Sequence, residues 1–205
     1  FANTFVTMMK GKRLFAEPVD VDNRSRAWFQ ECFKEDLLEN WRATVQREGL
    51  EIREQEKVTD IRGQIDAFEV VTDRGSYVAR RVVLAMGKSG NPRKLGIPGE
   101  KEFADRIHHR LLDADDFRQE HITIVGAGDV ACEAAIALAA DATNRVSLAA
   151  IDKAFTYPKK RNVAALRALE GEGKLRVLLD SQVRQVKADS VEIAVAGGAT
   201  EELEC

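Results

Sequence analysis

Hydrophobic positions follow a helical period in one early part of the chain. Across residues 34–47 apolar side chains recur on one face and charged side chains fill the other, which predicts an amphipathic helix. The apolar face carries Leu37, Leu38, Trp41 and Val45. Gly49 is suited to end this helix, because glycine adopts the left-handed conformation found there at no steric penalty. Residues 1–27 show no clear period, and we expect loop with one short strand in that part.

The shorter period of strands follows. Alternation of apolar and polar residues predicts strands over 50–54, 57–62 and 68–79, the last broken by a turn at 73–75. A continuous apolar run at 82–85 predicts a buried strand fed by this small meander. The residues after it include Gly87, Gly90, Pro92, Gly96, Pro98 and Gly99. This cluster of glycine and proline indicates a loop or a crossing between domains rather than a core element.

The second half of the chain alternates strands with helices. A continuous apolar run at 122–125 is typical of a strand buried on both faces, and a helix rich in small residues follows over 129–140. Next we expect a strand at 145–150, a helix at about 162–170, a strand at 174–179 and two short strands ending near 196. This order predicts an α/β fold with a Rossmann-like parallel sheet and crossover helices.

A glycine-rich loop joins the first of these strands to the first helix. Gly126 allows the tight turn, Gly128 lets a pyrophosphate approach the backbone, and Ala131 lets the helix pack closely on the strand. The helix N-terminus favours negative charge there. The strand, the helix and the second strand follow in the order that supports a dinucleotide site. The alternative interpretation is a structural turn that binds no ligand. The candidate ligands are Gly126, Ala127, Gly128, Asp129, Val130 and Ala131.

The end of the second strand bears on the choice between NAD and NADP. An acidic residue there binds the ribose hydroxyls of NAD, and basic residues replace it in NADP sites. Asp152 lies 24 residues after Gly128, slightly later than the usual acid, and several basic residues follow it. Both cofactors therefore stay open. The candidate residues are Ile151, Asp152, Lys153 and Arg161, and solvated loop charges are the alternative reading for each of them.

Composition excludes several classes of function. The chain has 205 residues, 44% of them hydrophobic, which is enough to build a core and argues against wholesale disorder. A net charge of −3 carries no footprint for nucleic acid, and no apolar stretch approaches the ~18 residues of a membrane span. The three cysteines form no C-x-x-C pair and no disulfide framework, so we expect a reducing, cytoplasmic setting. The three histidines fit no metal-binding spacing.

Two segments carry a resemblance to a known family. R-V-V-L-A-M-G-K-S-G-N-P-R-K-L-G-I-P-G-E and I-T-I-V-G-A-G-D-V-A-C-E-A-A resemble the thioredoxin-reductase-like pyridine nucleotide–disulfide oxidoreductases over about residues 40–190. The resemblance implies NAD(P)H at the Gly126 loop and FAD in the complete protein. The flavin residues that it implies are Val58, Ala85, Met86 and Gly87, with Met86 standing where the family's A-T-G motif has threonine.

Departures from that family shape the expected function. Residues 107–117 hold no C-x-x-C, so a dithiol relay is not supported, and the H-R-R-x-x-x-R pattern that reads an NADP phosphate is absent. The first G-x-G-x-x-G, which holds FAD, is also missing from these residues. We therefore expect a piece of a longer protein. Residues 1–112 would be part of a flavin-type domain with a small β-rich remnant, and residues 113–205 an NAD(P)-binding domain lacking its last strand.

Three functions compete at this point. The first is the nicotinamide-binding part of a flavin-dependent oxidoreductase that passes hydride from nicotinamide to FAD, inactive as this chain alone and needing no catalytic side chain of its own. The second is a non-catalytic dinucleotide sensor. The third, a different Rossmann enzyme such as a methyltransferase, is opposed by the 85–87 motif and the Pro/Gly crossing. No motif marks an electron acceptor, and exposed apolar surface of a half domain predicts self-association, with a homodimer as one form.

Overall fold

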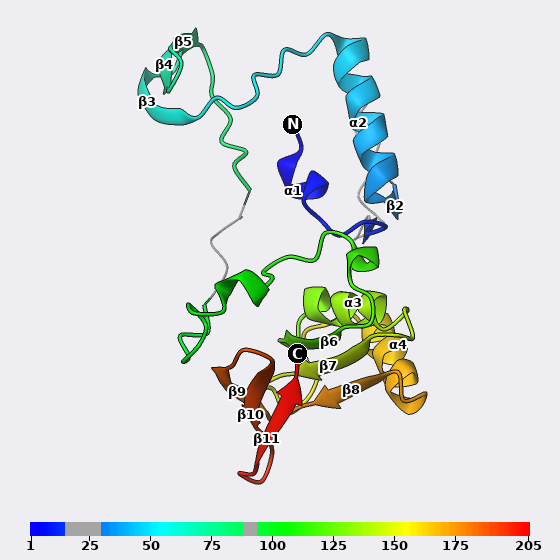
Figure 1. Ribbon diagram of the computed structural model, residues 1–205. Coiled ribbons are helices and arrows are strands. Elements are labelled where there is room, and N and C mark those ends of the chain that lie inside the picture. Colours follow the sequence, from blue (N-terminus) through cyan, green and yellow to red (C-terminus); the bar gives the residue numbers. More distant parts are fainter. Residues whose placement is uncertain (15–29, 88–93) are drawn as a thin grey trace. The chain divides into compact units, whose positions relative to one another are not determined.

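The computed structural model describes residues 1–14, 30–87 and 94–205 (Figure 1). Contacts within the chain divide it into unit 1, Phe1–Asn91, and unit 2, Pro92–Cys205. This division falls earlier in the chain than the expected domain boundary at 112/113. The physical reason is that apolar side chains of the intervening segment, among them Ile97, Phe103 and Ile107, pack on a core of unit 2.

Helical structure in unit 1 centres on the predicted amphipathic helix. Helix α2, Lys34–Glu48, confirms that prediction, and Gly49 ends it with φ 62°. Short elements precede it: α1, Asn3–Val6, and the antiparallel pair β1, Arg13–Leu14, and β2, Cys32–Phe33. The pattern at 1–27 did not predict α1, the expected short strand corresponds to β1, and residues 15–27 lie outside the described residues.

A buried lysine ties α1 to α2. The Lys34 side chain is buried, and its Nζ donates to the carbonyl oxygens of Met8 at 2.5 Å and Val6 at 3.4 Å. A cation near a helix C-terminus is favourable, since the last carbonyls there lack partners within the helix. Leu37 and Leu38 of the predicted apolar face are buried beside it.

Three antiparallel strands make the meander that the alternating pattern predicted. They are β3, Val58–Gln64, β4, Ala67–Thr72, and β5, Ser76–Ala79, in the order β3-β4-β5. The predicted turn at 73–75 joins β4 to β5, with the Thr72 N–H donating to the Gly75 carbonyl at 2.8 Å.

Two predicted strands of unit 1 are absent. Residues 50–54 form coil, and the chain just after them is held by side-chain bonds instead, with Glu56 accepting from Tyr77 at 2.6 Å and from Thr72 at 2.7 Å. Residues 82–85 also form coil, and Val83 is 85% exposed. An apolar run becomes a buried strand only beside partner strands, and none of the pairings among the described strands includes this segment.

The predicted parallel sheet forms the centre of unit 2. Its strands are β6, His121–Val125, β7, Arg145–Ala149, and β8, Leu175–Leu178, paired in that order. Helix α3, Asp129–Leu138, connects β6 to β7, and α4, Lys160–Gly171, connects β7 to β8. Two 3-10 turns, Ala104–Arg106 and Ala114–Asp116, precede the sheet. This confirms the α/β architecture, although β6 is half-buried rather than enclosed on both faces.

Unit 2 has a core on each side of this sheet (Figure 1). On one side α3 and α4 pack on the sheet through apolar residues that include Cys132, Ala135, Leu148 and Leu166. On the other side Ala149 and Leu178 meet the segment that follows β8. The central strand is therefore buried on both faces, by the helices on one side and by the segment after β8 on the other.

The final strands form a separate antiparallel sheet. They are β9, Gln182–Val186, β10, Ser190–Ala194, and β11, Thr200–Glu204, in the order β11-β10-β9. The sequence pattern predicted the first two and missed β11. Ile193 is fully buried in the core between this sheet and β7–β8. A contact of His121 Nδ1 with Glu204 Oε2 at 2.9 Å and an ion pair of Arg176 with Glu201 at 2.7 Å tie β11 to the parallel sheet.

Within the described residues, no helix combines the length and the apolar character needed to cross a membrane.

Candidate functional site

The loop between β6 and α3 has the backbone geometry that its glycines predicted. Gly126 has φ 136°, a conformation that side chains with a Cβ rarely adopt. Its N–H donates to the Ala149 carbonyl at 2.9 Å, so the loop leaves β6 while still bonded to β7. A Cβ at Gly126 would lie 3.6 Å from the Ala131 Cβ, which is ordinary van der Waals contact. The glycine requirement here is therefore one of conformation, and Ala131 supplies the close packing.

Gly128 presents open space in front of α3. It is the residue before the helix, with φ −90° and ψ 173°, and no side-chain hydrogen bond caps the helix at this position. No described atom lies within 4 Å of the place where its Cβ would be. Backbone N–H groups in the first turn of a helix lack partners within that helix and attract anions. The loop thus combines an approachable backbone with unoccupied donors.

The other residues of the loop divide between core and surface. Ala127 is buried in the core beneath α3, whereas Val130 is 76% exposed. Asp129, a candidate ligand, has its carboxylate engaged elsewhere: Oδ1 accepts from the Lys159 N–H and from Asn162 Nδ2, both at 2.8 Å. Neither Lys159 nor Asn162 belonged to the predicted set of site residues. No sequence signal marks this pairing, because the partners of the carboxylate are a backbone N–H and a neutral side-chain amide.

The structure brings the glycine loop and the end of the second strand to one edge of the sheet. Val125 and Ala149 are partners in the parallel register, so the residues after both strands leave the sheet at its carboxyl end. Ile151 follows β7 and is 71% exposed, and the Asp152 carbonyl accepts from the Asp180 N–H at 2.9 Å. Lys153 is exposed in the same connection, and Arg161 is exposed in the first turn of α4.

The residues implied for flavin lie in unit 1. Among the described contacts, none joins these residues to one another. Val58 begins β3 and is 50% exposed. Ala85, Met86 and Gly87 lie in coil, and the Met86 side chain is 81% exposed. These flavin assignments stay predictions.

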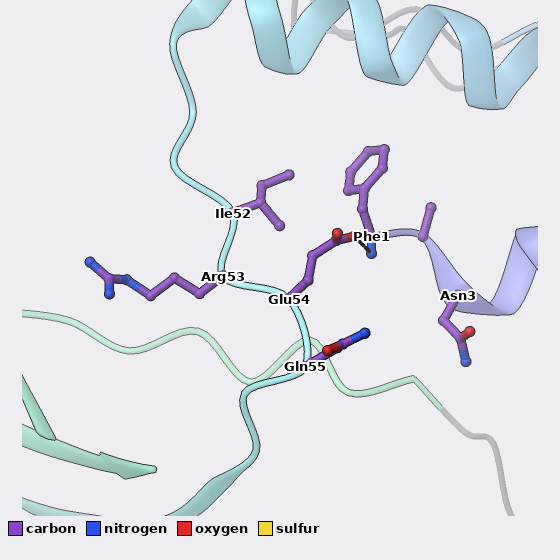
Figure 2. A pocket seen from close by; sticks show the side chains of 7 residues that line it. Phe1, Asn3, Ile52, Arg53, Glu54 and Gln55 are labelled. Atoms are coloured by element: carbon purple, nitrogen blue, oxygen red, sulfur yellow. Dashed lines mark hydrogen bonds and ion pairs between the residues drawn. The ribbon is translucent and has the colours of Figure 1, made fainter. Parts of the chain in front are cut away.

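A hollow in unit 1 lies between the start of the chain and residues 52–55 (Figure 2). The terminal ammonium of Phe1 pairs there with Glu54, which lowers the pKa of that carboxyl. No residue of either predicted cofactor set lines it.

Cys132 lies near the N-terminus of α3, where a thiol could be activated, and His108 and His109 are neighbouring titratable residues. Cys132 is fully buried in the core under α3, and burial raises the pKa of its thiol, with the Asp129 charge adding to the effect. The alternative of a thiol activated by the helix N-terminus is thus not supported. His108 packs its ring edge-on against Phe117, with centroids 5.3 Å apart, and His109 is exposed. Among the described residues no group of three or more acidic, histidine or cysteine side chains could hold a metal ion.

Similar structures share this fold. The bacillithiol disulfide reductase Bdr from Bacillus cereus matches with a TM-score of 0.80 at 19% identity, over 98% of this chain and 64% of that one. The thioredoxin reductase of T. acidophilum matches with a TM-score of 0.67 at 17% identity, over 86% of this chain and 58% of that one. At these identities the likeness concerns the fold alone.

Relatives in sequence are reductases of two kinds. The thioredoxin reductase of Treponema pallidum is 33% identical over 156 residues, which are 73% of this chain and 49% of that protein. A ferredoxin–NADP reductase of Thermus thermophilus is 31% identical over 137 residues, 65% of this chain and 40% of that protein. The chain thus spans about half the length of the first relative and less of the second. Residues 3–204 also match the family described as pyridine nucleotide-disulphide oxidoreductase. The chain belongs to the pyridine nucleotide-disulphide oxidoreductase family.

Proposed function

We propose that this chain is the NAD(P)H-binding part of a flavin-dependent oxidoreductase, and that the chain alone binds the nucleotide without turnover. Family membership supports FAD and NAD(P)H as the cofactors. Unit 2 is the proposed nicotinamide nucleotide domain. Unit 1 is the proposed part of the flavin domain, with Val58 and residues 85–87 as its flavin contacts.

The observation that carries this proposal is the open backbone at Gly128. A dinucleotide pyrophosphate needs helix N–H donors that no protein group already uses and a path to them that no Cβ blocks. Gly128 meets the second requirement, because its Cβ position is empty, and the uncapped start of α3 meets the first. The residues present therefore fit the group.

The chain's own residues have a positioning task. When bound, the nicotinamide supplies a hydride that the flavin of the complete protein accepts. The loop from Gly126 to Ala131 holds the pyrophosphate, and Ile151, Asp152, Lys153 and Arg161 lie at the same sheet edge to meet the adenosine ribose. Hydride transfer between two cofactors requires placement and electrostatics rather than an acid or base from the protein.

A calorimetric titration of the chain with NADH and with NADPH tests the proposal. We expect one site per chain and saturation, with a Kd between about 1 μM and 1 mM, the range in which enzymes commonly meet their substrates. The ratio of the two Kd values assigns the cofactor, because acidic Asp152 favours NADH and the basic residues around it favour NADPH. Absence of saturation by both nucleotides would refute the nucleotide-binding role.

A non-catalytic dinucleotide sensor is the second candidate. The exposure of Met86 favours it, because this residue of the implied flavin motif is 81% open to solvent. Two absorbance measurements separate the two functions. One is made on the chain after FAD is added, and the other on the complete protein. A flavin spectrum in the complete protein supports the oxidoreductase, and its absence supports the sensor.

Exposed apolar side chains next to the flavin motif predict self-association of this chain. Val83, Leu84 and Met86 are 85%, 67% and 81% exposed, and contiguous apolar surface of this kind favours contact with other molecules. We expect light scattering after size exclusion to show a dimer or larger species whose mass falls on dilution. The variant Val83→Asp with Leu84→Asp should shift the chain to monomer, and a wild-type monomer at all concentrations would contradict this prediction.

A further inference from the structure

One buried amide joins the first turns of α3 and α4. Asn162 is 8% exposed, and its Nδ2 lies 2.8 Å from Asp129 Oδ1 and 3.2 Å from Glu133 Oε1. The same Asp129 oxygen accepts the backbone N–H of Lys159 at 2.8 Å. We call the side chains of Asp129, Glu133 and Asn162, together with the Lys159 N–H, the helix clamp.

The clamp keeps a carboxylate away from the anion site. Asp129 is the first residue of α3, where an acidic side chain ordinarily turns toward its own helix N-terminus and interacts with the free N–H groups. Here the carboxylate oxygen is bonded to α4, at whose N-terminus its charge is also favourable. The donors of α3 that a pyrophosphate needs are therefore not used by Asp129.

The clamp also fixes where the basic start of α4 lies. Lys159 precedes the helix and its own N–H is part of the clamp, so the backbone of Lys159, Lys160 and Arg161 is held at a set position from the glycine loop. A charge-assisted hydrogen bond in a partly buried setting is strong enough to hold two helix ends in register. The loop and the basic segment are thereby one preorganised unit rather than two independent ones.

We infer that Asp129 and Asn162 are positioning residues for the nucleotide and not ligands of it. This inference rests on the proposed function. It adds that part of the nucleotide affinity comes from a contact between protein groups, which holds the site in its binding geometry. It replaces the direct ligand role that the glycine motif suggested for Asp129. Preorganisation raises affinity by removing ordering costs at the moment of binding.

The test measures nucleotide affinity and local backbone protection in the same variants of the full chain. Asn162→Ala and Asp129→Ala should each weaken binding of the preferred nucleotide, NADH or NADPH, by about 10-fold, since small misplacements of binding groups have effects of this size. The double variant should bind no more weakly than Asp129→Ala, because that change already removes the Asp129–Asn162 contact together with the Lys159 N–H bond. Asp129→Asn keeps an acceptor oxygen and should recover most of the affinity lost in Asp129→Ala. Hydrogen exchange should show faster exchange of the Lys159 amide in all variants that weaken binding.

Asn144→Ala is the matched control. Asn144 is also a buried asparagine, 5% exposed, and its Nδ2 donates to the carbonyls of Phe117 at 2.9 Å and Leu138 at 3.1 Å. It lies at the opposite end of α3, so its loss should lower Tm as Asn162→Ala does while leaving the nucleotide Kd and the Lys159 exchange unchanged.

The outcomes separate this inference from the proposed function. If wild type binds and Asn162→Ala binds equally well at a temperature where both are folded, the positioning role is overturned and the proposed function stands. Additive losses in the double variant, with an unchanged Lys159 exchange rate, would also overturn it, because they mark Asp129 as an independent ligand. If wild type binds neither nucleotide, the proposed function fails and this inference fails with it.

Discussion

Gly128→Val is expected to weaken NADH or NADPH binding by at least about 100-fold, a loss of ~2.7 kcal/mol, while Tm stays close to that of wild type. The backbone at Gly128, φ −90° and ψ 173°, is extended and suits a β-branched residue. No described atom would meet its Cβ within 4 Å, so the fold accommodates the new side chain. The same side chain stands where a pyrophosphate would reach the start of α3, and it keeps the phosphates from the N–H donors. Calorimetric titration and thermal unfolding measure the two effects.

Gly171→Val is the control for Gly128→Val. Gly171 ends α4, also has open space at its Cβ position, and lies in the same unit. Valine has a higher helix propensity than glycine, so stability and Kd should both be preserved.

Gly126→Val should lower Tm, unlike Gly128→Val, because φ 136° strains any residue with a Cβ. Binding by Gly128→Val with the wild-type Kd would place the nucleotide elsewhere and sink the assignment of this loop.

Gly99→Ala is expected to destabilise unit 2 by about 3 kcal/mol or more. A Cβ at this position would lie 1.8 Å from the Val186 carbonyl oxygen, and the backbone has φ 82°. The Val186 carbonyl belongs to the main chain and cannot rotate away, so the segment that holds residue 99 must separate from β9. The hydrogen bond from the Val186 N–H to the Pro98 carbonyl, 3.0 Å long, would be lost with the packing of Ile97 and Phe103. Urea unfolding followed by circular dichroism measures the loss.

Gly96→Ala separates strain from collision in this experiment. Gly96 has φ 70° and no atom within 4 Å of its Cβ position, so only the left-handed backbone resists substitution. The expected cost is about 1 kcal/mol. Equal losses for Gly96→Ala and Gly99→Ala would show that the contact of Gly99 with β9 contributes little to stability.

Elements whose stability is mostly local could be predicted from the sequence. The apolar face of α2 and the glycine at its end predicted that helix to within one residue, Lys34–Glu48 against 34–47. The β6–loop–α3 connection was predictable because the tight turn needs Gly126 and the close packing needs a small residue at 131. The positions of these motifs also placed the candidate nucleotide loop at the carboxyl end of the sheet, which the structure has.

Contacts between distant segments decided the rest. The run at 82–85 has the composition of a buried strand and forms exposed coil, because a strand requires partners that its own residues do not specify. Residues 97–107 join unit 2, because their apolar side chains find the core beside β9 and β10. The carboxylate of Asp129 turned to α4 rather than to the nucleotide loop for the same kind of reason.

The sequence by itself determined the class of fold, the helix and strand order of the second half, and the place of the glycine loop. Tertiary structure alone decided which runs became strands, where the two units divide, and which groups Asp129 binds. Periodicity and turn residues report the conformation of neighbouring residues, whereas the helix clamp joins residues about 30 positions apart, and no local pattern specifies such a partner.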